Sequence, residues 1–223
     1  MAVSVVQFPG SNRDQDMLDA VAHTTGKAPH KVWHGDTTLP EDTQAIVLPG
    51  GFSYGDYLRC GAIAARSPIM ADVVKAANSG MPVLGVCNGF QILIEAGLLP
   101  GALMRNASLK FVCKTIDLKV ESTRSPFLTQ FTNGDVWACP IAHGDGNYVC
   151  THDMLNTLQD EDRIAVTYAG GTNPNGSVAD IAGITNKAGN VLGMMPHPEN
   201  IALPHQPRQT GAKLFEGLLD LAA

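Results

Sequence analysis

The chain has 223 residues, enough for one large domain or two small ones with a full hydrophobic core. Hydrophobic residues make up 44% of it, which excludes general disorder. The 15 Lys and Arg against 21 Asp and Glu give a net charge of −6, which argues against a protein that wraps a nucleic-acid backbone. Charged residues are only 16%, against a typical value of about 25%. This deficit predicts either deep burial or a weakly charged face that meets a partner.

The five cysteines predict free thiols, because their number is odd and no two have the Cys-x-x-Cys spacing. Three of them lie in or near strand patterns and are expected to pack in the core: Cys113, Cys139 and Cys150. Cys60 follows a glycine-rich loop, and its role stays open. The N-terminus has no basic segment before Pro9, and no apolar run approaches the roughly 18 residues of a membrane span. We therefore expect a cytoplasmic protein.

The first part of the chain alternates short apolar runs with helical patterns. Strands are expected at residues 3–8, 31–34, 45–48 and 82–86. Helices are expected from a cap at Ser11-Asn12 to Gly26, then over 69–78 and 89–96. The run at 3–8 is apolar apart from Ser4 and Gln7, and such continuous runs are typical of strands buried on both faces. This rhythm predicts an α/β fold with a parallel sheet covered by helices on both sides.

The rest of the chain changes character, because strand patterns now follow one another. They lie at residues 111–120, 135–141, 163–168, 178–185 and 191–195, with hairpin chemistry between the last two at 186–190. A final helix is expected over 212–221. No linker, repeat or low-complexity stretch interrupts the chain, so we predict a single domain over residues 1–223.

The segment Gly85-Val86-Cys87-Asn88-Gly89 lies where a predicted buried strand meets a predicted helix. Its Gly-x-Cys-x-Gly pattern has the form of a nucleophile elbow in which sulfur replaces the serine oxygen. Such a turn strains the nucleophile's backbone and requires small neighbours. The helix N-terminus favours the thiolate form, and the N–H of Asn88 faces the oxyanion formed on attack. We predict that Cys87 is a nucleophile; the alternative is a buried structural cysteine.

A thiolate nucleophile needs a base, and His197 is the best placed of seven histidines. It lies in Met-Pro-His-Pro-Glu at 195–199, where an apolar run ends and two prolines fix the backbone. Residues two apart in extended backbone project to the same face, so Glu199 can orient the His197 ring. With Cys87 this predicts a Cys–His–carboxylate triad. The alternative is an ordinary surface histidine beside a glutamate.

Gly50 and Gly51 follow the strand predicted at 45–48. A glycine pair lets a backbone N–H approach a ligand, and strand ends in an open α/β sheet face the binding crevice. We therefore predict that the N–H groups of Gly51 and Asn88 form an oxyanion hole, the alternative being a plain glycine turn. No Gly-Lys-Ser/Thr follows, which excludes a P-loop.

The loop around His143 and Asp145 is polar and rich in glycine. Contact with a substrate, contact with a partner and a plain turn all stay open for it. His143, Asp145 and His152 lack any recognised metal-ligand spacing, so no metal site is expected.

These motifs resemble class I, triad-type glutamine amidotransferases, whose signatures are the elbow at Cys87 and the segment 195–199. The resemblance is closer to the glutaminase subunits of phosphoribosylformylglycinamidine synthase. It is carried by FPGSN at 8–12, PGGFSYGDYL at 49–58, GAIAARSPIM at 61–70, GVCNGFQ at 85–91, RNAS at 105–108, PIAHG at 140–144 and MPHPE at 195–199. Arg13 and Cys60 depart from the usual pattern of this group.

The resemblance implies a flavodoxin-like three-layer sandwich with a mainly parallel sheet and additional antiparallel strands. It implies a glutaminase that forms glutamate and ammonia through a γ-glutamyl thioester, with Cys87 as nucleophile, His197 as acid and base, and Glu199 as orienting partner. Gly51 and Asn88 match the oxyanion positions. Three further residues match positions that hold glutamine or line its pocket: Gln91, Asn106 and Ser108.

By the same resemblance, ammonia passes to a large synthetase subunit in a complex that also holds a small accessory subunit. That partner binds ATP and Mg²⁺ and converts formylglycinamide ribonucleotide to formylglycinamidine ribonucleotide in purine biosynthesis. No cofactor is implied for this chain, and neither nucleic acid nor membrane is an expected partner. We also expect a weakly charged rim around Cys87 that docks on the synthetase. Two alternatives are a stand-alone cysteine hydrolase or peptidase on a related fold, and a non-catalytic regulatory module.

Overall fold

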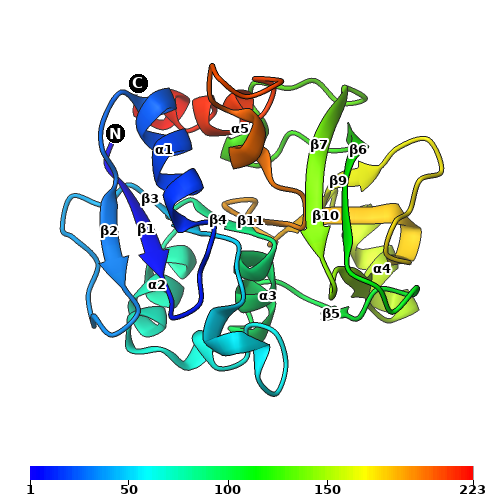
Figure 1. The fold of residues 1–223 in the computed structure, drawn as a ribbon, viewed down its shortest axis with the longest axis horizontal. Helices are drawn as coiled ribbons and strands as arrows, with labels where there is room; N and C mark the ends of the chain where they lie inside the picture. Colours follow the sequence, from blue (N-terminus) through cyan, green and yellow to red (C-terminus); the bar gives the residue numbers. More distant parts are fainter. Residues whose placement is uncertain (223) are drawn as a thin grey trace.

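The computed structural model describes residues 1–222, and its centre is a nine-stranded mixed sheet (Figure 1). Five neighbouring strands are parallel: β2 (His30–Trp33), β1 (Val3–Gln7), β3 (Ala45–Leu48), β4 (Val83–Val86) and β11 (Val191–Met194). Antiparallel strands extend the sheet beyond β11: β10 (Ile181–Thr185), β9 (Ile164–Tyr168), β6 (Val112–Val120) and β7 (Val136–His143). The expected combination of a mainly parallel sheet with added antiparallel strands is confirmed.

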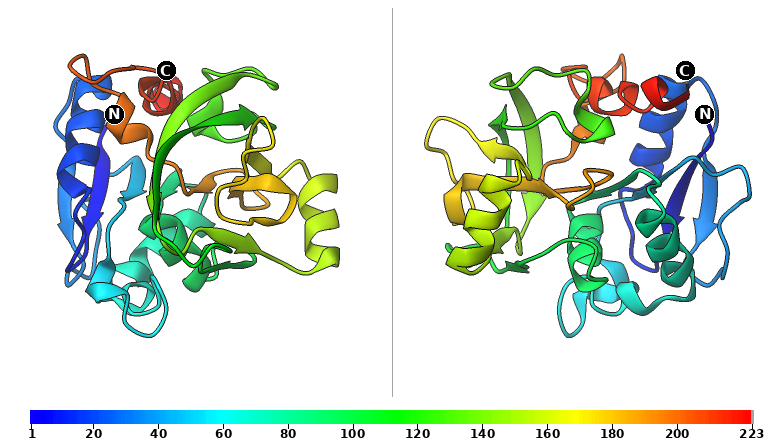
Figure 2. Two further views of the ribbon diagram at one scale, coloured as in Figure 1. Left: turned by 45° about the vertical axis from the view of Figure 1, so that its right-hand side comes forward. Right: turned by 180° about the vertical axis from the view of Figure 1, so that it is seen from behind.

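Helices cover both faces of the parallel strands and complete the three layers. Figure 1 shows α1 (Asp14–Thr25) and α5 (Ala212–Glu216) on one side, and α2 (Pro68–Asn78) and α3 (Asn88–Glu95) on the other. Figure 2 shows α4 (His152–Asp160), in yellow-green, beside the antiparallel strands and far from the two termini. Every residue of β3, β4 and β11 is buried. This explains why these strands have no charged residues and no alternation of apolar and polar residues.

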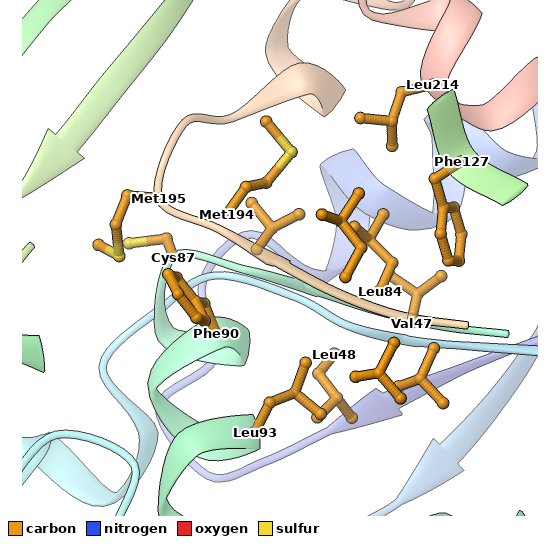
Figure 3. Close-up of a cluster of buried hydrophobic side chains, with 14 of the residues drawn as sticks. Val47, Leu48, Leu84, Cys87, Phe90, Leu93, Phe127, Met194, Met195 and Leu214 are labelled. Atoms are coloured by element: carbon orange, nitrogen blue, oxygen red, sulfur yellow. The ribbon is translucent and has the colours of Figure 1, made fainter. Parts of the chain in front are cut away.

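The core packs against both faces of β3, β4 and β11. Figure 3 shows Phe127 and Leu214 on one side of these strands and Phe90 and Leu93 on the other. All four side chains are fully buried. Burial on two faces thus accounts for part of the low charged fraction of the chain.

Helix α1 begins differently from the prediction. Its N-cap is Arg13, and no side chain caps the first turn. Ser11 instead forms a β-bridge with Gly51, and its hydroxyl accepts a hydrogen bond from the N–H of Phe8 at 3.2 Å. The predicted Ser11-Asn12 cap is therefore wrong, because this segment braces the glycine loop after β3.

The second half of the chain holds further differences. Helix α4 was not predicted: Thr151 caps it by accepting from the N–H of Met154 at 3.2 Å, but Leu158 is its only fully buried residue. A small sheet of β5 (Ala102–Met104) and β8 (Asn147–Val149) was also not predicted. The C-terminal helix ends at Glu216 rather than 221, and a short 3₁₀ turn (Leu219–Ala222) follows Gly217, a residue that weakens helices.

The cysteines are only partly where the strand patterns placed them. Cys139 is buried and Cys150 is half-buried and packs against the core, as expected, but Cys113 is exposed, so the prediction for Cys113 is wrong. Cys113 lies on β6, where an exposed side chain alternates with buried ones further along the strand. Across the described residues, no helix combines the length and the hydrophobicity that crossing a membrane requires.

Candidate active site

Cys87 lies at the junction of β4 and α3, as predicted. Its backbone has φ 51° and ψ −105°, a strained conformation that residues other than glycine rarely adopt. A Cβ atom on Gly89 would lie 2.0 Å from the carbonyl oxygen of Leu48, and one on Gly85 would lie 2.6 Å from the carbonyl oxygen of Gly89. Only glycine fits at both positions, so the elbow pattern in the sequence reflects close backbone packing around the thiol.

His197 follows β11, the neighbour of β4 in the sheet. The register pairs Met194 with Val86, so the residues that follow these two strands meet at the same sheet edge. The Nδ1 atom of His197 lies 2.6 Å from Oε1 of Glu199, and both side chains are buried. A Cβ atom on Gly50 would lie 2.8 Å from Cε1 of His197, so the ring packs directly on this backbone. The carboxylate of Glu199 and the backbone of Gly50 therefore both hold the ring in place.

The charge on His197 depends on its two neighbours. Burial lowers the pKa of His197, but Glu199 and Cys87 raise it more, and the result is a pKa of about 10. The Nε2 atom of His197 is buried without a well-formed hydrogen bond in the described part of the chain, and the Cys87 thiol is the neighbour that interacts with the ring. The thiol also lies 3.9 Å from the carbonyl oxygen of Ala142 on β7. At neutral pH the ring is an imidazolium whose Nε2 proton is free for transfer.

A cavity of about 160 Å³ opens over these groups. Its wall contains both Cys87 and His197, together with Gly51 and Gln91. The arrangement places a nucleophilic sulfur, a proton donor and backbone N–H groups around one small space. Those are the groups that acyl transfer to a thiol requires.

The two predicted oxyanion residues occupy different places. Gly51 lines the cavity with φ 150°, and a Cβ atom there would lie 2.7 Å from Cα of Ser11. Asn88 is the first residue of α3, so its N–H has no partner within the helix. Its side chain does not line the cavity but accepts from the N–H of Ser53 at 3.1 Å and donates to Oε1 of Gln91 at 2.8 Å. Asn88 thus ties the glycine loop to the elbow.

The three predicted substrate residues also differ in position. Gln91 lines the cavity, and its Nε2 donates to the carbonyl oxygen of Asp145 at 2.8 Å. Asn106 is fully buried behind the wall. Ser108 is exposed and outside the cavity, and its hydroxyl accepts from the N–H of Lys110 at 3.3 Å. The structure therefore brings Gln91 to the site directly and Asn106 indirectly, and it leaves Ser108 apart.

Other cavity residues had no assigned role in the sequence. His143 and Asp145 line the wall, and the signal that could have placed them is the strand end: β7 ends at His143. Cys60 lines the wall as well. Burial raises the pKa of the Cys60 thiol, and the nearby carboxylate of Asp56 raises it further. Both effects favour the protonated thiol form of Cys60, which disfavours this residue as a nucleophile.

Residues 1–222 contain no group of three or more His, Cys, Asp or Glu side chains arranged to hold a metal ion.

Comparisons with known proteins agree with this geometry. The CobB/CobQ-like glutamine amidotransferase domain family matches residues 1–215. The chain is 55% identical over 223 residues to phosphoribosylformylglycinamidine synthase subunit PurQ of Brucella suis, covering 100% of both chains. It is 53% identical over 222 residues to the same subunit of Bartonella henselae, covering 100% of this chain and 99% of that one.

Solved structures extend the likeness to the fold. The structure of PurLQS from Thermotoga maritima matches with a TM-score of 0.90 at 43% identity, covering 100% of this chain and 99% of that one. A glutamine amidotransferase of the same organism matches with a TM-score of 0.68 at 15% identity, which shows the shared fold alone. The chain therefore belongs to the glutamine amidotransferases and, within them, to the PurQ family of phosphoribosylformylglycinamidine synthase subunits.

Proposed function

We propose that the chain hydrolyses glutamine to glutamate and ammonia at the cavity over Cys87. The observation that carries this proposal is the position of the Cys87 thiol. It projects from a strained backbone into the cavity that His197, the buried partner of Glu199, also borders. Membership of the glutamine amidotransferase family supports it. The whole of residues 1–223 is proposed to act as one glutaminase domain, since a single sheet runs through both halves and the family match spans 1–215.

The reaction begins when the Cys87 thiolate attacks the carboxamide carbon of glutamine. The N–H groups of Gly51 and Asn88 hold the oxyanion of the tetrahedral intermediate. His197 then gives its Nε2 proton to the leaving nitrogen, the carbon–nitrogen bond breaks, and ammonia departs from a γ-glutamyl thioester. His197, now neutral, takes a proton from water, and the hydroxide attacks the thioester. The bond between the acyl carbon and the Cys87 sulfur then breaks, glutamate leaves, and the sulfur is again a thiolate beside a protonated His197.

The substrate contacts follow from the cavity wall. Gln91 is proposed to contact glutamine directly, since it lines the wall. Asn106 supports the wall from behind, because its side-chain amide is hydrogen bonded to the carbonyl oxygens of Lys110 and His143. Ser108 stays a prediction from the resemblance, and in this structure it does not reach the cavity.

The ammonia is proposed to pass to a partner. The relatives are subunits of phosphoribosylformylglycinamidine synthase, and a structural neighbour is PurLQS. We therefore propose that this chain assembles with a large synthetase subunit and a small accessory subunit. The large subunit would bind ATP and Mg²⁺ and make formylglycinamidine ribonucleotide from formylglycinamide ribonucleotide. The proposed location is the cytoplasm, where purine biosynthesis supplies such substrates.

The first prediction concerns Cys87. In the assembled complex, Cys87→Ala should abolish glutamate release and glutamine-dependent amidine formation, because the thioester cannot form. Ammonium chloride should still support amidine formation at the unchanged rate, since the synthetase is intact. Both products are measured by chromatography with wild-type and variant complexes.

The matched control is Cys60→Ala, which removes the other thiol of the cavity and should keep at least half of the glutaminase activity. Full glutaminase activity in Cys87→Ala would refute the proposed function. Strong glutaminase or peptidase activity of the chain without any partner would favour a stand-alone hydrolase. No glutamate release from any mixture would favour a regulatory module.

A further inference from the structure

We propose that His143 is a substrate-binding residue whose Nε2 atom accepts a hydrogen bond from the carboxamide N–H₂ of glutamine. The proposal rests on the proposed function, since it names a further contact of the same reaction. It is carried by the position of His143 in the cavity, by the hydrogen bonds that fix its ring, and by a buried nitrogen without a partner.

The cavity has a buried end and an open end. Cys87, His143 and His197 line its wall and are 6%, 3% and 2% exposed, so they form the buried end. Phe52 and Phe111 line the same wall and are 44% and 55% exposed, so they form the open end. Because Cys87 attacks the carboxamide carbon, the carboxamide has to occupy the buried end, and the α-amino acid group has to face the mouth. His143 therefore lies at the carboxamide end.

The hydrogen bonds of Asn106 determine which ring nitrogen of His143 carries the proton. The Nδ2 atom of Asn106 donates to two carbonyl oxygens, those of Lys110 at 2.8 Å and of His143 at 2.9 Å. This fixes the amide orientation, and Oδ1 then accepts from the N–H of Gly146 at 3.0 Å and from Nδ1 of His143 at 3.1 Å. Nδ1 must therefore hold a proton, and Nε2 of the neutral ring presents a lone pair.

The ring is also held neutral and immobile. Burial lowers the pKa of His143, and the nearby positive charge of His197 lowers it further, to about 4. A Cβ atom on Gly146 would lie 2.4 Å from Cε1 of His143, so the ring packs on this backbone without room to turn. Nε2 is buried and has no hydrogen-bond partner among the described residues. A fixed, unpaired acceptor of this kind, in a residue that lines the cavity, is available to a donor from outside the chain.

Glutamine supplies that donor. At its carboxamide end the only hydrogen-bond donors are the two N–H bonds of the leaving nitrogen. An acceptor that holds one of them fixes the rotation of the carboxamide, so that the carbonyl oxygen turns toward the oxyanion N–H groups. The same contact rejects acyl compounds without an N–H at this position, because the lone pair of Nε2 would then face another lone pair.

The test compares two substrates and two substitutions in the assembled complex. His143→Asn keeps an N–H₂ where Nδ1 was, so the bond to Asn106 survives, but it removes the acceptor at the Nε2 position. His143→Gln places an acceptor at the Nε2 position and loses the bond to Asn106. Glutamine is compared with the γ-methyl ester of glutamate, which forms the same thioester but has no carboxamide N–H.

We expect His143→Asn to lower kcat/KM for glutamine by about 10- to 100-fold and to leave kcat/KM for the ester unchanged or higher. We expect His143→Gln to recover part of the activity with glutamine. Equal losses on both substrates in His143→Asn, or no loss on either, would overturn the proposal. Melting temperatures of both variants separate misfolding from lost binding, and wild-type activity that depends on Cys87 shows that the proposed function holds independently.

Discussion

Two buried histidines at one cavity have opposite protonation states, because charged neighbours raise the pKa of one and lower that of the other. No carboxylate among the described residues raises the pKa of His143, and burial and the charge of His197 lower it to about 4. Burial also lowers the pKa of His197, but Glu199 and Cys87 overcome this and raise it to about 10. At neutral pH one ring can only accept a hydrogen bond from substrate at Nε2, whereas the other can donate a proton there. Their different surroundings thus give two identical side chains different roles, one as hydrogen-bond acceptor and one as proton donor.

Glu199→Gln tests the charged member of this pair. We expect kcat for glutamine hydrolysis to fall by about ten-thousandfold, as when the carboxylate of a similar triad is lost. We also expect the alkaline limb of the pH–kcat profile to move to lower pH. The carboxylate raises the pKa of His197, so without it the imidazolium loses its proton at a lower pH and cannot protonate the leaving nitrogen. Profiles of both complexes between pH 6 and 10.5 measure the shift. An alkaline limb at the same pH in both would contradict this assignment.

The elbow between β4 and α3 shows how one element junction depends on glycine. The carbonyl oxygen of Leu48 in β3 lies where a Cβ atom of residue 89 would be, and it belongs to backbone that is itself buried in the sheet. The helix can therefore approach the sheet closely only without that atom. This close approach holds Cys87 in its strained conformation.

Gly89→Ala should therefore destabilise the protein by about 1–3 kcal/mol, the usual result of overpacking a rigid site. It should also lower glutaminase activity by at least tenfold in the fraction that stays folded, because the helix start must move. Urea denaturation measures the first effect and glutamate release the second. Gly35→Ala is the matched control, since its Cβ would meet only the Trp33 side chain, at 3.3 Å, and should change neither. Equal stability of the two variants would disprove the packing argument.

The sequence predicted the features that local patterns encode, and it missed those that depend on distant contacts. The elbow could be predicted from the sequence because its glycines and its nucleophile lie within five residues. Helix α4 has helical periodicity, but it is short and mostly polar and buries only one side chain completely, so it was missed. The role of His143 could not be predicted, because its tautomer is set by Asn106, which is 37 residues away in the chain. Ser108 matches a family motif but lies outside the cavity, because a position in a motif does not determine where a loop residue points.

At the scale of the molecule, exposed apolar side chains accompany the cavity mouth. Phe52 and Phe111 line the cavity, and the loops that carry them also present Tyr57, Leu58 and Leu109, which are 75%, 92% and 74% exposed. The same wall includes charged residues such as Arg13 and Asp145, so the rim is only partly the weakly charged surface that composition suggested. Burial in the sheet explains much of the missing charge, and these loops are the remaining apolar surface near the site.

Leu58→Asp tests whether this rim meets the synthetase. We expect about tenfold weaker binding to the large subunit, the effect of losing a buried apolar contact at an interface. Glutamine-dependent synthesis should fall accordingly at limiting subunit concentration, while ammonia-dependent synthesis should not change. Val136→Asp is the control, because Val136 is also exposed, at 61%, but begins β7, the strand whose other end lies at the cavity. If both substitutions weaken binding equally, the rim has no special part in docking.

The position of β11 has a consequence for the order of events during translation. This strand is the fifth of nine in the sheet, between β4 and β10, yet it is made more than 100 residues after β4. Until it emerges from the ribosome, β4 has an unpaired edge, and the N–H of Cys87 lacks the carbonyl oxygen of Met194, its acceptor at 2.8 Å. A nascent chain therefore carries the thiol without the imidazole. Ammonia production can begin only once the last strand has entered the middle of the sheet.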